Sequence, residues 1–251
     1  MIMDWTLVEY AVLGFCAQMV DGALGMAYGV ISTTFLLSMG LPPATASASV
    51  HAAEVVTTGV SGASHVFQGN VDRRLFVPLA ISGVLGGVLG AYVLTEIPGD
   101  VVKPIVAAYL LALGMIILRR GILGRQTRQR ARRLWPLGIG GGFLDAAGGG
   151  GWGPVVTTTL LAHGHMPQRA IGSVSLSEFF VSAAISATFV ATIGIDHWQI
   201  IAGLIAGGAL AAPIAAYLVK HIKPRILMMT VGVLVILLSL RTLALALNLF
   251  A

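Results

Sequence analysis

Long apolar segments constrain this chain more than any other feature of its sequence. Eight such segments run through the 251 residues, and charged side chains interrupt them rarely. About 20 apolar residues are enough to cross the ~30 Å hydrocarbon core of a bilayer. Charged residues make up 10% of the chain, against about 25% in a soluble domain. Helices satisfy their own backbone in lipid, and the segments lack the alternation of barrel strands. The sequence therefore predicts an all-α polytopic membrane protein.

The apolar segments form two groups of four. They cover residues 5–39, 44–67, 75–94 and 101–118, and then 134–163, 170–195, 198–219 and 226–249. As one helix, residues 5–39 would measure about 50 Å, which is too long for a single span. Glycine-rich stretches interrupt the first segment of each group, at residues 21–29 and 145–154. Broken backbone at membrane depth persists only where protein or a watery cavity covers it. Each first segment is therefore predicted to be a re-entrant helical hairpin, or two short helices that meet at a glycine turn.

The chain also contains an internal repeat. Residues 21–72 match residues 145–196 without a gap, with 17 identities in 52 positions. The identities include an Asp before each glycine-rich stretch and a Glu within the following segment. Weak repeats of this kind are typical of secondary transporters. We expect a first transmembrane repeat over residues 1–118, a basic cytoplasmic linker over 119–133 and a second transmembrane repeat over 134–251.

Positive charge predicts how the two repeats face. If each repeat is one hairpin followed by three spans, the repeats are inverted, and thirteen of the fifteen basic residues share one face. Those thirteen are Arg73, Arg74, the seven arginines of residues 119–133, Arg169, Lys220, Lys223 and Arg225. Lys103 then lies on the opposite face, and Arg241 lies inside a span. If each first segment were a single crossing, the split would be nearer ten to five, so the inverted arrangement is favoured.

Glycine motifs recur in both copies of the repeat. The second copy carries Gly141-Gly142-Phe143, Gly148 to Gly151, Pro154, Gly164, Ala170 and Gly172-Ser173, and the looser first copy runs from Gly14-Phe15 through Gly25 and Gly29 to Gly40. This pattern resembles the signature of the sulfite exporter TauE/SafE family, and the resemblance covers nearly the whole chain. It implies a carrier that moves small sulfur-containing anions, such as sulfite or sulfonates, across the bacterial inner membrane.

The glycine turns are candidates for the substrate site. Each exposes free backbone N–H groups at the start of a helix, where the helix dipole adds roughly half a positive charge. Two such tips, brought together by pseudo-twofold symmetry, would bind an anion without Lys or Arg. Alternatively, the glycines only allow helices to pack closely. Tyr28 and Trp152 occupy matching places in the two tips. They would line or gate a substrate cavity between the tips, or pack against neighbouring helices. The predicted substrate-binding residues are Gly22, Gly25, Tyr28, Gly29, Gly148, Gly149, Gly150, Gly151, Trp152 and Gly153.

Acidic residues at membrane depth are candidates for proton coupling or gating. Asp21 and Asp145 precede the glycine tips, where a carboxylate can cap a helix or carry a proton. Glu54 and Glu178 occupy the same repeat position within their spans, and His51 and Ser175 stand three residues earlier on the same helix face. A buried acid in a span is a natural proton carrier, although it can also hold a hairpin in place by hydrogen bonds.

Other classes of function find little support in the sequence. No Ser/His/Asp or Cys/His pattern with credible spacing predicts catalysis, and no metal site or cofactor is expected, since His163 and His165 lack a third ligand. The arginines of the linker are expected to contact anionic lipid rather than nucleic acid. The prediction is therefore a multi-pass carrier of a small anion that works by alternating access, either coupled to a gradient of protons or another ion or acting by facilitated export, with the buried acids as candidates for carrying a proton. An anion channel and an intramembrane enzyme are the alternatives, and both a monomer and a homodimer fit the sequence.

Overall fold

The computed structural model describes residues 5–24, 26–123, 133–194, 197–218 and 224–247, and all regular structure within them is helical. The predicted all-α architecture is confirmed for this part of the chain. The first half comprises α1 (Trp5–Leu24), α2 (Tyr28–Ser38), α3 (Pro43–Phe67), α4 (Arg73–Glu96) and α5 (Gly99–Leu123). The second half comprises α6 (Leu134–Gly148), a π-helical turn η1 (Gly153–Thr157), α7 (Thr158–Ala162), α8 (Pro167–Ile193), α9 (Trp198–Leu218) and α10 (Pro224–Ala246).

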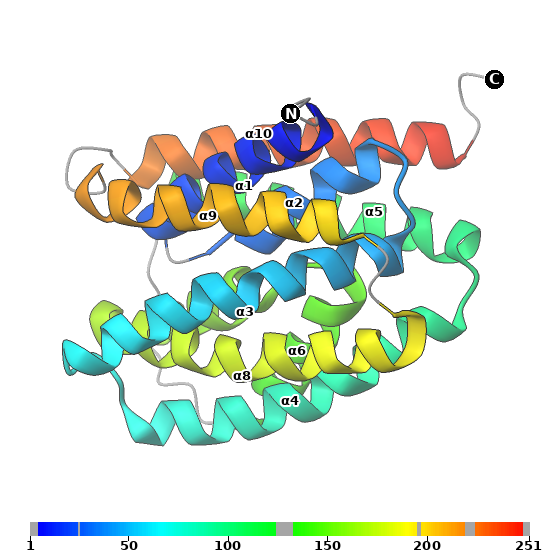
Figure 1. Cartoon of the computed structure of the whole chain (residues 1–251). Helices are drawn as coiled ribbons and strands as arrows, with labels where there is room; N and C mark the ends of the chain where they lie inside the picture. The colour runs from blue at the N-terminus through cyan, green and yellow to red at the C-terminus, as the bar shows by residue number, and fades with distance from the viewer. Residues whose placement is uncertain (1–4, 25, 124–132, 195–196, 219–223, 248–251) are drawn as a thin grey trace.

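Both long first segments are broken, as the sequence predicts. The chain leaves α1 at Leu24 and starts α2 at Tyr28, and Ala27 between them has a φ of 101°. In the second half the break falls at Gly149 and Gly150, whose φ angles are 67° and 152°. A positive φ is easy for glycine and strained for alanine. Each pair of arms forms a hairpin whose two outer ends lie at the same end of the bundle (Figure 1).

The two halves pack against each other through equivalent pairs of helices. Helix α1 packs on α9 and α4 packs on α6, while α3 packs on α9 and α4 packs on α8. The two remaining large contacts join counterparts, α3 with α8 and α5 with α10. Both counterpart pairs are antiparallel. In the first pair Glu54 lies near Ser182 and Gly62 near Leu176, and in the second Gly114 lies near Val235 and Gly121 near Met229. Glycines permit the closest approaches, because a Cβ at Gly86 or Gly207 would collide with backbone of the facing helix.

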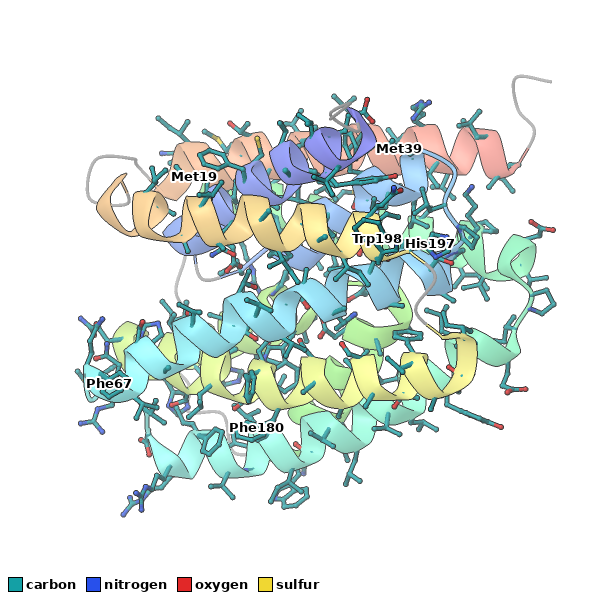
Figure 2. All side chains as sticks on the ribbon, viewed as in Figure 1. Met19, Met39, Phe67, Phe180, His197 and Trp198 are labelled. Atoms are coloured by element: carbon teal, nitrogen blue, oxygen red, sulfur yellow. The ribbon has the colours of Figure 1, made fainter. Side chains whose placement is uncertain are left out.

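The outer surface of the bundle suits a lipid environment. Four of the described helices are long and apolar enough to cross a membrane, namely α4, α5, most of α8 and the Met228–Ala246 part of α10. Large apolar side chains cover the flanks, and Phe180 of α8 projects outward, as Figure 2 shows. Trp135 and Trp198 begin or nearly begin their helices and are 50% and 61% exposed, which suits the enrichment of tryptophan at membrane–water interfaces. The chain is a multi-pass membrane protein.

Most of the described arginines gather at one end of the bundle, which we call the basic end. Its residues are Arg73, Arg74, Arg119, Arg120, Arg133, Arg169 and Arg225. Two hydrogen bonds join the first half to the second at this end. The Asp72 N–H donates to Ser173 Oγ at 2.8 Å, and Arg225 donates to the Ile122 carbonyl at 3.1 Å. Lys103 lies at the far end, whereas Lys220, Lys223 and the arginines within residues 124–132 lie outside the described residues.

Candidate functional site

The tips of the two hairpins meet in the middle of the bundle. The Thr33 hydroxyl of α2 donates to the Gly149 carbonyl, which joins one hairpin to the other. The backbones of Gly29 and Gly150 are so close that a Cβ on either would collide with the other. The Tyr109 hydroxyl on α5 donates to the Gly150 carbonyl at 3.3 Å. The repeat therefore places both glycine-rich stretches at one central point, where two hydroxyl groups of the first half hold the tip of the second hairpin.

Each hairpin carries the same internal contact between an Asp and the start of its second arm. Asp21 Oδ1 accepts a hydrogen bond from the Tyr28 N–H at 3.4 Å, and Asp145 Oδ1 accepts one from the Trp152 N–H at 2.9 Å. The two pairs have the same spacing of seven residues. A carboxylate here satisfies an N–H group that has no partner within the helix, and it complements the helix dipole. Both aspartates thus act as caps that hold the hairpins in shape.

A buried histidine connects the first half to the second hairpin. His51 on α3 is fully buried, and its Nδ1 lies 2.8 Å from the Ser47 carbonyl, so Nδ1 carries a proton. Its Nε2 lies 3.2 Å from Asp145 Oδ2. Because Nδ1 donates, a hydrogen bond at Nε2 requires either a charged imidazole facing a carboxylate or a protonated Asp145. In both cases the His51–Asp145 pair holds one proton between the two halves.

Two glutamates lie beside this pair. Glu54 Oε2 lies 3.9 Å from His51 Nε2 and accepts a hydrogen bond from the Ser182 hydroxyl at 3.4 Å. Glu178, its counterpart on α8, faces the same central cavity. Ser175, the counterpart of His51, is half-buried, and within the described residues it makes no hydrogen bond to the acidic groups. The acidic positions are therefore symmetric between the halves, but the histidine contact exists in one half alone.

The groups that meet at the centre enclose a small cavity. Its volume of about 10 Å³ is close to the space that one water molecule needs. The cavity is lined by Ala27, Tyr28, Gly29, Val30, Glu54, Asp145, Gly150, Gly151, Gly153, Pro154 and Glu178. Five of the predicted substrate-binding residues are among them. The centre is closed, with no room for an anion in this conformation.

Four of the other predicted substrate-binding residues, Gly22, Gly148, Gly149 and Trp152, lie in the described part of the chain and do not line the cavity. Gly22 is in α1, Gly148 packs against the Tyr109 ring, and Gly149 contacts Thr33. Gly25 lies outside the described residues. Trp152 is fully buried, and its indole N–H donates to the Val174 carbonyl at 3.3 Å. That contact anchors the second hairpin to α8.

The three groups His51, Glu54 and Asp145 also resemble a set of metal ligands, although the sequence predicts no metal site. One donor atom from each lies within 4.8 Å of the other two. The ring nitrogen and the carboxylate of Asp145 are already hydrogen-bonded to each other, so a proton satisfies this pair without a metal. Folding brings these three groups together, since Asp145 is 94 residues from His51 along the chain.

Sequence reasoning overlooked several residues of the site. Ser47 supports His51 and donates to the Ala146 carbonyl at 2.6 Å, and Tyr109 reaches the second tip from α5. Ser182 had a detectable signal, because a hydroxyl follows each repeated glutamate by four residues, at Thr58 and at Ser182. Tyr109 lies in the middle of its apolar segment, and nothing in the local sequence indicates that it belongs to the site.

Known proteins resemble this chain over most of its length. Residues 10–242 match the family described as sulfite exporter TauE/SafE. The chain is 44% identical, over 94% of its own length and 82% of the relative's, to the "Probable membrane transporter protein YtnM" of Bacillus subtilis (strain 168). A match of 30% identity to the "Probable membrane transporter protein ORF9" of Sinorhizobium sp covers 41% of this chain and 40% of that protein. No solved structure matches. The chain is a membrane transporter that belongs to the sulfite exporter TauE/SafE family.

Proposed function

We propose that this transporter is a proton-linked carrier of a small anion that works by alternating access in the plasma membrane of a bacterium. One observation carries the proposal: two symmetric hairpin tips close on a buried Asp145–His51–Glu54 cluster around a cavity with room for about one water. A carrier needs a central site that can be shut from both sides. The closed centre also favours a carrier over an open channel.

The acidic centre explains why a proton would accompany the anion. Glu54, Asp145 and Glu178 line the same cavity, and as carboxylates they would repel an anion placed at the hairpin tips. Protonation removes that repulsion, and a charged His51 would attract the anion. The helix starts at the two tips then offer backbone N–H groups to it. Binding of the anion and of protons is therefore mutually favourable, and the affinity for the anion is expected to rise as pH falls.

Antiparallel counterpart helices support inverted halves. Helix α3 and its counterpart α8 run in opposite directions, and so do α5 and α10. A pseudo-twofold axis that relates antiparallel helices is perpendicular to them, so it would lie in the plane of the membrane. The seven arginines of the basic end, three of which belong to the linker, then mark the cytoplasmic face. Repeats at 1–118 and 134–251 fit this arrangement.

The family's name makes sulfite the first substrate to test. Organosulfonates, which share its sulfur oxyanion group, come next, and sulfate and carboxylates serve as comparisons. Binding is measured as the shift in thermal unfolding of the purified protein at several pH values. We expect one of these anions to raise the melting temperature, and to raise it more at low pH. Equal shifts at all pH values would argue against a shared role for the proton.

Variants of the two central glutamates test whether proton binding controls anion transport. In proteoliposomes, Glu54→Gln removes a proton-binding group and keeps the size of the side chain. We expect anion flux through this variant to lose the pH dependence of the wild type, and Glu178→Gln to behave similarly. Asp100→Asn, at the start of α5 and far from the centre, is the control. Unchanged pH dependence in both glutamate variants would refute proton coupling at these residues.

A further inference from the structure

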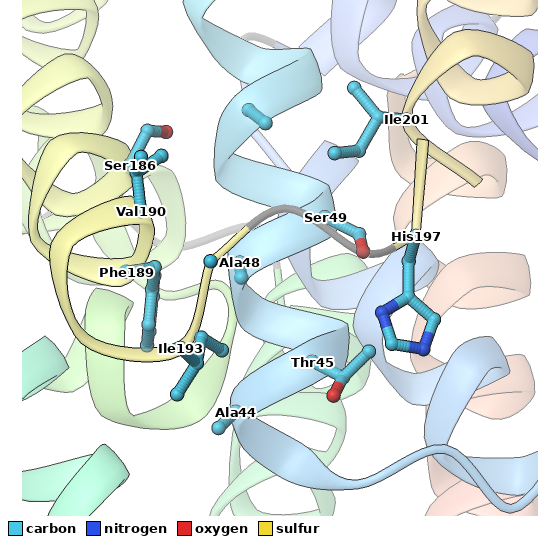
Figure 3. Close-up of a pocket in the computed structure, with 12 residues that line it drawn as sticks. Ala44, Thr45, Ala48, Ser49, Ser186, Phe189, Val190, Ile193, His197 and Ile201 are labelled. Atoms are coloured by element: carbon cyan, nitrogen blue, oxygen red, sulfur yellow. The ribbon is translucent and has the colours of Figure 1, made fainter. Parts of the chain in front are cut away.

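A second, larger cavity lies away from the centre, at the end opposite the basic end. It is lined by the start of α3, the end of α8 and the start of α9, and its volume is about 180 Å³. Figure 3 shows Phe189 and Ile193 of α8 on one side, His197 on the other, and Thr45 and Ser49 of α3 between them. No Asp, Glu, Lys or Arg is among the described residues that line it.

The corresponding place at the basic end is closed. Ser173 of α8, the repeat counterpart of Ser49, is bonded to the backbone N–H of Asp72 at 2.8 Å. The neighbouring Gly172 packs directly on the Asn70 backbone. Ser49 is equally buried, yet within the described residues it has no hydrogen-bond partner. The same pair of helices, α3 and α8, is therefore sealed at one end and separated by a cavity at the other.

One aromatic side chain separates this cavity from the central cluster. Phe189 lines the cavity, is 1% exposed, and has its ring centroid 6.5 Å from that of His51. His51 in turn contacts Asp145 and Glu54. A ring at this distance makes direct aromatic contact. A molecule in the cavity would thus reach the central cluster once the Phe189 side chain moves.

We infer that this cavity is the vestibule of the transport path, that it binds a small oxyanion before the anion enters the centre, and that Phe189 is the gate between them. The inference rests on the proposed carrier function and adds to it a separate binding site. Hydroxyl groups and an imidazole can all donate hydrogen bonds to an oxyanion, and no carboxylate among the described lining residues opposes it. Ser186 supports this role, because its hydroxyl is buried on the cavity wall without a partner in the described part of the chain.

Thiol labelling tests the vestibule without depending on transport. Ser49→Cys is introduced together with Cys16→Ala, because Cys16 is the chain's sole cysteine and is exposed. A sulfonated, membrane-impermeant maleimide is added to vesicles from the face opposite the basic end. We expect Ser49→Cys to react, and methanesulfonate to slow its reaction at least fivefold. The matched control is Ser173→Cys, at the equivalent position of the sealed end, which should stay unmodified from this face.

Each outcome has a defined meaning. An unreactive Ser49→Cys, or equal reaction of Ser173→Cys, would overturn one-sided access, and reaction without protection by methanesulfonate would overturn the oxyanion site. Protection that requires phosphatidylglycerol vesicles, and is absent in phosphatidylcholine, would assign the cavity to a lipid headgroup instead. If labelling behaves as expected but the protein carries no anion, the carrier proposal fails and the binding site stands.

Variants of Phe189 test the gate. Phe189→Ala should raise the leak of anion into vesicles that contain no exchangeable anion at least fivefold, relative to exchange. Phe189→Leu keeps a bulky apolar side chain and should restore the wild-type ratio of leak to exchange. A purely structural role for Phe189 would lower leak and exchange together, and that result would contradict the gate.

Discussion

At the scale of single residues, Asp145 has more partners than its repeat counterpart. It caps the start of η1 through the Trp152 N–H at 2.9 Å and also contacts His51, whereas the contact of Asp21 within the described residues is a longer one, of 3.4 Å, to the Tyr28 N–H. Removal of a cap costs about 1 kcal/mol. His51 and Asp145 form a buried ion pair when the imidazole is charged, and removal of one member of such a pair costs about 3–5 kcal/mol.

We therefore predict that Asp145→Ala lowers the free energy of unfolding by at least about 3 kcal/mol, and that Asp21→Ala lowers it by about 1 kcal/mol. Unfolding by SDS in mixed micelles measures both values. Asp145→Asn keeps an acceptor for the Trp152 N–H, so its loss should fall between the two. Equal losses for the two alanine variants would show that the His51 contact contributes nothing.

The sequence located the acidic residues of the site more readily than their partners. The repeat alone placed Asp21 with Asp145 and Glu54 with Glu178, because identical residues recur at identical spacing. It could not show that His51 lies closer to Asp145 than to Glu54, the neighbour on its own helix face, at 3.2 Å against 3.9 Å. That preference arises from the packing of α3 against the second hairpin, which local spacing does not encode.

At the scale of elements, the hairpin tips depend on two glycines that face each other. A Cβ on Gly29 would lie 2.8 Å from Glu54 Oε1 and 2.9 Å from the Gly150 Cα, both shorter than van der Waals contact. Overpacking of this kind typically costs about 1–3 kcal/mol. The backbone of Gly150 has to move to relieve it, and that motion displaces the tip from the acidic cluster.

Gly29→Ala is accordingly expected to reduce anion flux at least tenfold while the protein still reaches the membrane. Gly140→Ala is the matched control, because a Cβ at Gly140 meets nothing within 4 Å, and its flux should equal that of the wild type. Flux is measured in proteoliposomes at equal protein content. Normal flux through Gly29→Ala would show that the close contact of the tips is unimportant for transport.

The sequence predicted where the hairpins break and which helices follow, but it did not predict how the helices pair. Glycine clusters and over-long segments mark the breaks near Ala27 and Gly149. The contacts of α1 with α9 and of α4 with α6 depend on glycines that fit against distant backbone, for example Gly86 on Ile139. Contact surfaces of this kind leave no periodic pattern of residues in the sequence from which helix pairing could be predicted. Helix α3, although it was predicted from the segment 44–67, is less apolar than the four spanning helices, because it carries buried polar residues such as Ser47, His51 and Glu54.

At the scale of the whole molecule, charge predicts the orientation in the membrane. Arg74 at the basic end and Lys103 at the far end should face opposite sides. In a Cys16→Ala background, an impermeant thiol reagent added outside whole cells should label Lys103→Cys and leave Arg74→Cys unmodified until the cells are opened. Labelling of both, or of Arg74→Cys alone, would contradict inverted halves with a cytoplasmic basic end.

The central claim is that the closed centre belongs to a carrier rather than to a channel. Counterflow in proteoliposomes measures this most directly: vesicles loaded with an unlabelled sulfonate or sulfite receive a trace of the labelled anion outside. We expect transient, saturable accumulation of label above its equilibrium level, faster at low pH and absent in vesicles without internal anion. Ohmic current through planar bilayers, with no counterflow at any pH, would contradict it.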